Sequence, residues 1–279
     1  MSDLAFTEHE IERYSRNILL SEVGAEGQRR LRASSAFVVG AGGLGSPALL
    51  YLAAAGVGRL GLADGDAVEL SNLQRQIIHG TPDLGRPKTV SAEEAVRRIN
   101  PDCRVDVLAD RLTAANIRQT IRGYDVVLDG SDNFPTRFLV ADCCWFERIP
   151  LASAAVLRFE GQLMTILPGE GNPCYRCFIP EPPPAGLVPR CQEAGVLGPV
   201  VGAMGALQAV EAMKVLLGIG QDMARRLLVY DALECSFRVI KRTQDPECPL
   251  CGPQATITHL IDYAASCCPG GRCDGAGAT

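Results

Sequence analysis

The stretch VVGAGGLGSPALL, residues 38–50, decides the fold of this chain. Small apolar residues lead into a glycine-rich turn, and a helix-like run of apolar residues follows it. Gly40, Gly42 and Gly45 have the spacing G-x-G-x-x-G, which permits a tight turn, close approach of the backbone to phosphate and close packing of the next helix. The first N–H groups of that helix would point toward an anion. The stretch therefore predicts a nucleotide-phosphate site at the end of a buried strand, with a plain glycine turn as the alternative.

Strand-like and helix-like patterns alternate around this turn. A T-x-x-E capping box at Thr7 and Glu10 predicts the start of a helix. That helix has one apolar face, formed by Ile11, Tyr14, Ile18 and Leu19. The patterns predict strands over residues 36–39, 58–63, 124–128, 150–156 and 161–167, and helices over 45–55, 88–99 and 113–122. Such alternation predicts an α/β fold built on a doubly wound, Rossmann-like, mostly parallel sheet.

The second half of the chain has a different pattern. Residues 174–191 are dense in proline and predict a surface loop. A long apolar helix over 195–218 follows, and strands over 227–230 and 236–240 are close enough in sequence to form a C-terminal antiparallel extension of the sheet. The cysteine- and glycine-rich tail, 264–279, has too little hydrophobic content to pack, and we expect it to be flexible.

These patterns predict one domain over residues 1–263, followed by the tail. Within that domain we expect N-terminal helices over 1–34 and a nucleotide-binding core over 35–170. The remainder, 171–263, would hold a metal site, a crossover loop and the antiparallel strands. A chain of 279 residues that is 47% hydrophobic is long enough for one large domain with a substantial core.

Bulk properties exclude several classes of protein. The net charge of −5 is spread without long like-charge runs, which argues against a nucleic-acid partner. The most apolar segment, 195–218, contains Gln208, Glu211 and Lys214, so it predicts a buried helix and no membrane span. The polar, acidic N-terminus does not resemble a signal peptide, and we expect a cytoplasmic protein.

A carboxylate follows the glycine turn at the distance that nucleotide sites require. Asp64 comes 19 residues after Gly45, at the end of the next predicted strand, where it can accept hydrogen bonds from ribose hydroxyls. NAD and ATP both contain ribose, so this pair of features is compatible with either nucleotide.

Residues around the turn favour ATP. Ligands of such sheets bind at the carboxyl ends of the strands, and Asp132 follows the strand predicted over 124–128. A carboxylate beside phosphates suits a magnesium-nucleotide site. Arg75 and Lys88 lie in loops at the same predicted edge and can neutralise a triphosphate. Taken singly, each charged residue is equally typical of a solvated loop.

The combined motifs resemble the MoeB/ThiF/HesA family of adenylyltransferases, bacterial relatives of the ubiquitin-activating enzymes. The resemblance extends from about residue 13 to 263. It rests on G-x-G-G-L-G at 40–45, D-x-D at 64–66, SNLQRQ at 71–76, GRPK at 85–88 and SDN at 131–133. It implies an enzyme that uses ATP to adenylate the C-terminal glycine of a small ubiquitin-like sulfur carrier of the MoaD or ThiS type, ending in Gly-Gly. Pyrophosphate leaves, and the acyl-adenylate is later converted to a thiocarboxylate.

The resemblance also assigns roles to residues. Gly43 would lie against the phosphates, Asp64 would hold the ribose, and Asp132 would bind magnesium. Arg16 would cross a homodimer interface to the partner's ATP, although Asn17 stands beside it where relatives have glutamine. The full predicted nucleotide set is Gly40, Gly42, Gly43, Gly45, Asp64, Ser71, Asn72, Arg75, Lys88, Asp132 and Asn133.

The expected chemistry is an in-line attack of the carrier's carboxylate on the α-phosphorus. Both reactants are anions, so positioning and charge neutralisation suffice and no general base is required. The predicted catalytic residues are Arg16, Arg75, Lys88, Asp132 and Cys191. The prolines of 180–190 would border the channel for the carrier's tail or would form a solvated linker.

Paired cysteines predict a metal site. Cys174 and Cys177 form one C-x-x-C, and Cys248 and Cys251 form another. Four thiolates make a tetrahedral structural zinc set, with two independent thiol pairs as the alternative. Four further cysteines lie in apolar or strand-like stretches and are expected in the core: Cys103, Cys143, Cys144 and Cys235.

Cys191 stands apart from the other cysteines. It follows the proline-rich loop just before the long helix, where a thiolate would be favoured, and it matches a cysteine that some relatives use in sulfur handling. A functional and a structural role are equally compatible with this position. The tail cysteines Cys267, Cys268 and Cys273 are not expected to pass sulfur or bind metal. Some relatives carry a sulfur-delivering rhodanese domain beyond this point, and its absence predicts a separate sulfur donor protein.

Two other function classes remain compatible with part of the sequence. An NAD-dependent oxidoreductase would use the glycine turn and Asp64 but would leave Arg75, Lys88 and Asp132 without a role. A non-catalytic scaffold that binds carrier proteins would not need the nucleotide residues. Molybdopterin synthesis, thiamine synthesis and tRNA thiolation are each compatible pathways.

Overall fold

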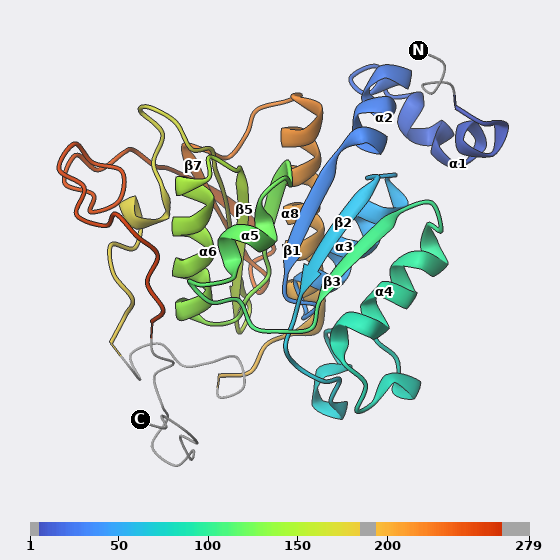
Figure 1. The fold of residues 1–279 in the computed structure, drawn as a ribbon, viewed down its shortest axis with the longest axis horizontal. Coiled ribbons are helices and arrows are strands. Elements are labelled where there is room, and N and C mark those ends of the chain that lie inside the picture. The colour runs from blue at the N-terminus through green and yellow to red at the C-terminus, as the bar shows by residue number, and fades with distance from the viewer. Residues whose placement is uncertain (1–5, 185–193, 264–279) are drawn as a thin grey trace.

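The computed structural model describes residues 6–184 and 194–263. An eight-stranded sheet forms its centre, with strand order β3-β2-β1-β4-β5-β6-β7-β8 (Figure 1). The strands are β1 Ser35–Val39, β2 Arg59–Ala63, β3 Arg104–Leu108, β4 Val126–Asp129, β5 Leu151–Leu157, β6 Glu160–Ile166, β7 Arg226–Asp231 and β8 Ser236–Lys241. The predictions for Cys191, Cys267, Cys268 and Cys273, for the tail and for residues 185–191 of the proline-rich loop lie outside the described residues. The start of that loop was predicted at the surface, but Cys174, Tyr175 and Arg176 are buried.

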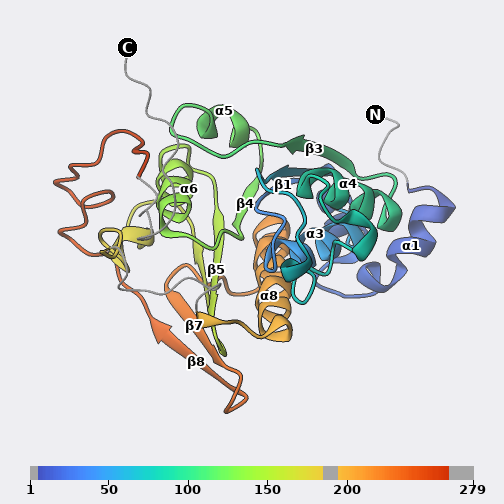
Figure 2. The ribbon, with the colours of Figure 1, turned by 90° about the horizontal axis from the view of Figure 1, so that it is seen from below.

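Helices cover both faces of this sheet (Figure 2). The helices are α1 Glu8–Ile18, α2 Gly24–Ala33, α3 Gly45–Ala54, α4 Lys88–Ile99, α5 Ile117–Ile121, α6 Phe134–Phe146 and α8 Gly198–Leu217. Strand β1 is buried along its whole length. Its Val38 points into a core shared with α3, α4 and α8, and its Phe37 and Val39 point into a second core with α5 and α6.

The order of the strands creates a switch point between β1 and β4. Strands β3, β2, β1, β4 and β5 are parallel, with β2 and β3 on one side of β1 and β4 and β5 on the other. Connections therefore leave β1 and β4 in opposite directions and open a crevice at their carboxyl ends, where ligands of such sheets bind. The glycine turn follows β1 at this crevice.

The antiparallel part begins earlier than the sequence predicted. β6 pairs antiparallel to β5, and β7 and β8 continue that arrangement. Only Arg158 and Phe159 separate β5 from β6, and a parallel crossover needs about a dozen residues or more, so a hairpin is the only possible connection. The predicted doubly wound, mostly parallel sheet with a C-terminal antiparallel extension is confirmed as a type of fold.

The sequence patterns missed β3 and α6, while α2 lies within the N-terminal helices expected over residues 1–34. Most of α6 is buried, including Asp142, so the helix lacks the one-sided apolar stripe that marks an amphipathic helix. β3 is an edge strand in which only Val105 is fully buried, while Arg104 and Val107 are exposed, so it has no clear buried apolar face.

Two predictions about burial were wrong in part. Cys103, Cys143 and Cys144 are buried as expected, and burial raises the pKa of the Cys103 thiol to about 11 and that of Cys143 to about 12. Cys235, however, is exposed, because it lies in the β7–β8 turn with a φ of 50°.

The apolar face predicted for the first helix is only partly buried. On α1, Tyr14 is buried and hydrogen-bonded to Asn100, whereas Ile11 and Leu19 remain exposed.

Helix α8 has the length and composition of a membrane span, but it packs against the sheet and helix α3. Among the described residues it is the single helix that passes this test, and 56% of its most apolar window is buried. Its Gln208 donates hydrogen bonds from Nε2 to the carbonyl oxygens of Asp129 in β4 and Ala152 in β5, each at 2.8 Å. These contacts agree with the predicted core helix.

A buried ion pair fixes the C-terminal segment to α6. The guanidinium of Arg176 donates to both carboxylate oxygens of Asp142 at 2.8 and 2.7 Å, and the two side chains are 2% and 1% exposed. The same guanidinium also donates to the hydroxyl of Tyr263 and stacks on Phe138. Arg176 therefore connects α6, the first cysteine pair and the end of the described chain.

Substitution Asp142→Ala should lower the free energy of unfolding by about 3–5 kcal/mol, because it leaves the Arg176 charge buried without its carboxylate. Urea denaturation followed by circular dichroism measures the change. Glu93→Ala, which removes only an exposed pair with Arg97, is the control and should cost less than about 0.5 kcal/mol. A similar small loss for Asp142→Ala would show that the buried pair is not stabilising.

Candidate nucleotide and metal sites

The three glycines of the G-x-G-x-x-G turn after β1 are required for different structural reasons. Gly40 has a φ of +89°, which side chains rarely permit. A Cβ on Gly45 would lie 1.9 Å from the carbonyl oxygen of Gly40, so α3 can approach the turn only without a side chain there. A Cβ on Gly42 would meet only the Gln76 amide at 3.8 Å. The exposed side of the turn at Gly42 is therefore open to a ligand.

The predicted ribose carboxylate is held against this turn. Asp64 follows β2, and its Oδ2 accepts a hydrogen bond from the backbone N–H of Ala41 at 2.8 Å. Its Oδ1 accepts from the N–H of Asp66 at 2.9 Å. Burial raises the pKa of Asp64, and nearby Lys88 opposes that shift. A carboxylate can accept about four hydrogen bonds, so Asp64 retains capacity for ribose hydroxyls.

The predicted cations occupy different environments. Lys88 begins α4 with its side chain only 8% exposed, and its Nζ lies 3.1 Å from Oδ2 of Asp66. Arg75 is half-buried and donates to the carbonyl oxygen of Ser71 at 3.1 Å, with no carboxylate within ion-pair distance among the described residues. Asn72 is buried and donates to the Ser71 hydroxyl at 3.4 Å. The Lys88 ammonium is thus fixed in position by Asp66, and the Arg75 guanidinium is available to bind an anion.

Asp132 lies in the loop after β4 and is exposed. Its neighbour Asn133 caps α6 by accepting a hydrogen bond from Thr136 N–H at 2.9 Å, so Asn133 has a structural role in addition to any contact with nucleotide. Buried Asp129, at the end of β4, accepts hydrogen bonds from both the N–H and the hydroxyl of Ser131. These bonds fix the start of the loop that carries Asp132.

The structure brings most predicted nucleotide residues to one edge of the sheet. The turn after β1 and the loop after β4 touch, because a Cβ on Gly40 would lie 3.2 Å from the carbonyl oxygen of Gly130. Arg16 is the exception: α1 precedes β1 and lies at the amino ends of the strands, away from the glycine turn (Figure 1). Within one chain, Arg16 is not part of this site.

The sequence patterns missed several polar residues beneath the site. Asp129 and Gln208 form the buried network just described, and Arg137 donates to the carbonyl oxygen of Ser131 at 2.7 Å. His79 contacts the glycine turn from below. The sequence places Gln208 in a mostly apolar helix, but this pattern does not indicate which groups it would bind.

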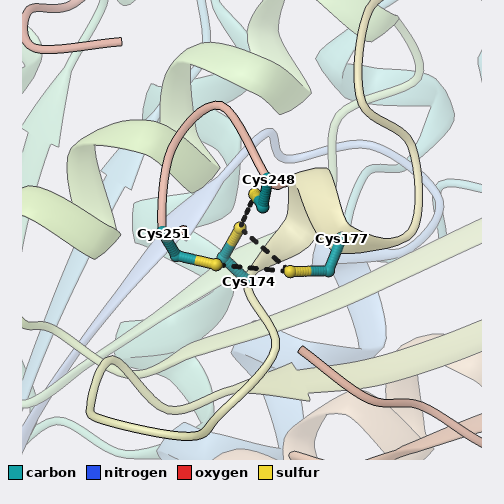
Figure 3. A group of neighbouring side chains, drawn as sticks. All are labelled: Cys174, Cys177, Cys248 and Cys251. Carbon is teal, nitrogen blue, oxygen red and sulfur yellow. Dashed lines mark hydrogen bonds between the residues drawn. The ribbon is translucent and has the colours of Figure 1, made fainter. Parts of the chain in front are cut away.

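The four predicted metal ligands meet in one cluster (Figure 3). The sulfur atoms of Cys174 and Cys248 lie 3.4 Å apart, those of Cys177 and Cys251 3.3 Å, and those of Cys174 and Cys177 3.8 Å. All four sulfur atoms lie within 4.8 Å of one another. Tetrahedral zinc with Zn–S bonds of about 2.3 Å would separate its sulfurs by about 3.8 Å, so the cluster fits a metal ion of this size.

The four thiols of the cluster are coupled by hydrogen bonds. These bonds lower the pKa of Cys177 to about 7 and also lower that of Cys248, while they raise the pKa values of Cys174 and Cys251. Asp245 N–H donates to Sγ of Cys177 at 3.4 Å. Buried Arg242 donates to the carbonyl oxygen of Cys174 at 2.9 Å, and its positive charge offsets the negative charge of a tetrathiolate site.

The fold and this edge of the sheet define a nucleotide-binding α/β protein. A model of the ThiF family matches residues 14–250, and the chain belongs to that family. A sulfur carrier protein adenylyltransferase from Thermus thermophilus is 49% identical over 268 residues, which cover 95% of this chain and 99% of the relative. A SAMP-activating enzyme E1 from Haloferax volcanii is 49% identical over 259 residues, which cover 92% of this chain and 95% of the relative.

Other comparisons extend this likeness. The adenylyltransferase and sulfurtransferase MOCS3 of Bos taurus is 50% identical over 94% of this chain, which spans 58% of that longer protein. The crystal structure of E. coli MccB with ATP superposes with a TM-score of 0.74 over 86% of this chain and 74% of that one. At 21% identity, this last comparison shows a shared fold alone.

Substitution Cys248→Ser should remove most bound zinc and lower the melting temperature by on the order of 10 °C, since metal binding to the cluster contributes folding energy. Metal analysis of the unaltered chain should find one zinc per chain. Trp145, the single tryptophan, packs against the cysteine cluster, so its fluorescence should change when the metal is lost.

The exposed Cys235 supplies the control, because Cys235→Ser should retain both metal and melting temperature. An unaltered chain without zinc, or a Cys248→Ser variant that melts like the unaltered chain, would refute a structural metal site.

Proposed function

We propose that this chain is an ATP-dependent adenylyltransferase that activates the C-terminal glycine of a ubiquitin-like sulfur carrier. The observation that carries the proposal is the 49% identity, over nearly the whole of both chains, to a relative named sulfur carrier protein adenylyltransferase. The archaeal and bovine relatives have names of the same kind. An NAD-dependent oxidoreductase is not favoured. Residues 1–263 would act as one adenylation domain, in molybdopterin or thiamine biosynthesis or a related thiolation pathway.

The charges of the site suit attack by one anion on another. The carrier's carboxylate would attack the α-phosphorus of ATP and pyrophosphate would leave. Arg75 has no carboxylate partner among the described residues, and Lys88 is held in place by Asp66, so both can stabilise the developing charge. The turn is open beside Gly42, and it would hold the phosphates. The half-buried Asp64 would hold the ribose.

Two metal ions belong to this proposal. Asp132 would hold magnesium together with phosphate oxygens, and such an ion neutralises triphosphate charge. In support, Asp132 is exposed at the ligand-binding edge and forms no ion pair within 4.0 Å among the described residues. The four-cysteine cluster would hold zinc as a closed structural site, which leaves no open coordination position for catalysis.

Substitution Asp132→Ala should lower carrier-dependent exchange of labelled pyrophosphate into ATP by at least about 100-fold, because it removes the magnesium ligand. The melting temperature should stay unchanged, since the side chain is exposed. Asp102→Ala, an exposed carboxylate near the amino end of β3, is the matched control and should retain exchange.

No exchange by the unaltered chain with any Gly-Gly carrier would refute the proposed function and favour a non-catalytic scaffold. Normal exchange by Asp132→Ala alone would refute only the role of that residue.

We further propose a cytoplasmic homodimer that receives sulfur from a separate donor protein. Exposed apolar side chains support a partner surface: Leu19 on α1 is 73% exposed, Tyr51 on α3 is 59% exposed and Val210 on α8 is 50% exposed. Helices α3 and α8 pack side by side, so the last two side chains belong to one region. A second copy would cover these residues and bring its Arg16 to the first copy's ATP.

Pairing two inactive variants tests the role of Arg16 in the partner. Arg16→Ala and Asp132→Ala homodimers should both be inactive in pyrophosphate exchange. A mixed dimer, co-expressed with two tags and purified through both, should recover about half of the unaltered activity, because one of its two sites is complete. If Arg16 acted within its own chain, both sites of the mixed dimer would be defective and the activity would stay absent.

A further inference from the structure

A buried histidine contacts the glycine turn from beneath. His79 lies in the loop after the SNLQRQ segment, and it is 7% exposed. Its Nε2 is 3.0 Å from the carbonyl oxygen of Ala41, and its Nδ1 is 2.8 Å from the hydroxyl oxygen of Ser91 in α4. The imidazole therefore connects the turn after β1 to the helix that carries Lys88.

The hydrogen bonds of His79 determine where its proton lies. A carbonyl oxygen can only accept, so Nε2 must carry hydrogen and donate to Ala41. Burial lowers the pKa of His79, which keeps the ring neutral at pH 7. In the neutral ring Nδ1 then has a lone pair, which the Ser91 hydroxyl at 2.8 Å can satisfy as a donor. The Ala41 carbonyl thus selects the tautomer, and Ser91 holds the other side of the ring.

This contact orients the next peptide group. The described chain has no cis peptide bond, and in a trans peptide the C=O of one residue and the N–H of the next point in opposite directions. Because the Ala41 carbonyl points down to His79, the Gly42 N–H points away from the protein core. The N–H of Ala41 is held at the same time by Asp64 at 2.8 Å. Both sides of Ala41 are therefore fixed.

Within residues 6–184 and 194–263, the Gly42 N–H has no hydrogen-bond partner. Among the described residues, neither Gly42 nor Gly43 donates a backbone hydrogen bond, and the space beside Gly42 is open up to Gln76. Oriented N–H groups at the start of a helix form an anion site, and α3 begins at Gly45. A polar donor that is free and fixed in direction is suited to a phosphate oxygen.

We propose that His79 is a positioning residue that directs the Gly42 N–H toward the phosphates of ATP, with Ser91 as the group that holds Nδ1 of its ring in place. The inference rests on the proposed function, in which this turn binds ATP. His79 itself lies beneath the turn and would not touch the nucleotide. Replacing His79 should therefore weaken the binding of ligands that have phosphates and leave the binding of other ligands unchanged. A residue with only a general role in stability would affect both kinds of ligand alike.

Substitution His79→Phe tests this dependence with two ligands. Phenylalanine has a similar ring but cannot donate, so the Ala41 carbonyl loses its partner. We expect the Kd for ATP to rise about tenfold, the size of one hydrogen bond to a charged group. The Kd for adenosine, which has ribose and base but no phosphate, should change less than about twofold. Isothermal titration calorimetry measures both constants.

Two further variants separate positioning from packing. His79→Gln keeps an N–H donor in place of Nε2 and should recover most of the ATP affinity. Ser91→Ala keeps the ring but removes the hydroxyl that holds its Nδ1, and should weaken ATP binding by about two- to fivefold at an unchanged melting temperature. These variants keep the test decisive if His79→Phe does not fold.

The outcomes distinguish this inference from the proposed function. An unaltered chain that binds no ATP would overturn both. An unaltered chain that binds ATP, with the His79 and Ser91 variants binding it equally well, would overturn this inference alone. Equal loss of ATP and adenosine affinity in these variants would also overturn it, because the residue would then act on general packing.

Discussion

The arrangement at the carboxyl edge of the sheet depends on close contact between backbones around β1. The start of α3 lies against the Gly40 carbonyl so closely that a Cβ on Gly45 would be 1.9 Å from its oxygen. A Cβ on Gly130, after β4, would be 2.9 Å from the carbonyl oxygen of Val39. Only glycine permits both approaches. Because the two loops meet here, residues from separate strand–helix units can face one ligand.

Charges at this edge are set in position before any ligand binds. Lys88 is almost fully buried, and a buried cation needs a partner. Its ion pair with Asp66, at 3.1 Å, fixes the position of the Nζ atom. Asp64 is likewise fixed by two backbone N–H groups. Such preorganisation avoids reorganisation during the attack of one anion on another, which is the main demand of this chemistry.

A few strong polar contacts, and no large hydrophobic core of its own, attach the C-terminal segment 242–263 to the rest of the domain. Residues 242–263 contain no helix or strand, yet they carry two of the four clustered cysteines. Arg242 and Arg176 anchor the two ends of this segment through hydrogen bonds to Cys174 and Tyr263. Metal ligation and buried ion pairs can hold irregular chain where hydrophobic burial is small, and this explains why the cysteine pairs come from segments distant in sequence.

The sequence by itself predicted the glycine turn, the central strands and the two C-x-x-C pairs, because each of these depends on local spacing that is visible in a short window. The tertiary structure brings the two pairs together. The sequence did not reveal α6, whose burial removes the amphipathic signal, or the reversal at β6. Only the tertiary structure decided that Arg16 lies away from the site of its own chain, that Cys235 is exposed, and that Gln208 and His79 support the loops. His79 and Ala41 are separated by 38 positions and Gln208 and Asp129 by 79, so their contacts depend on the path of the whole chain around the sheet.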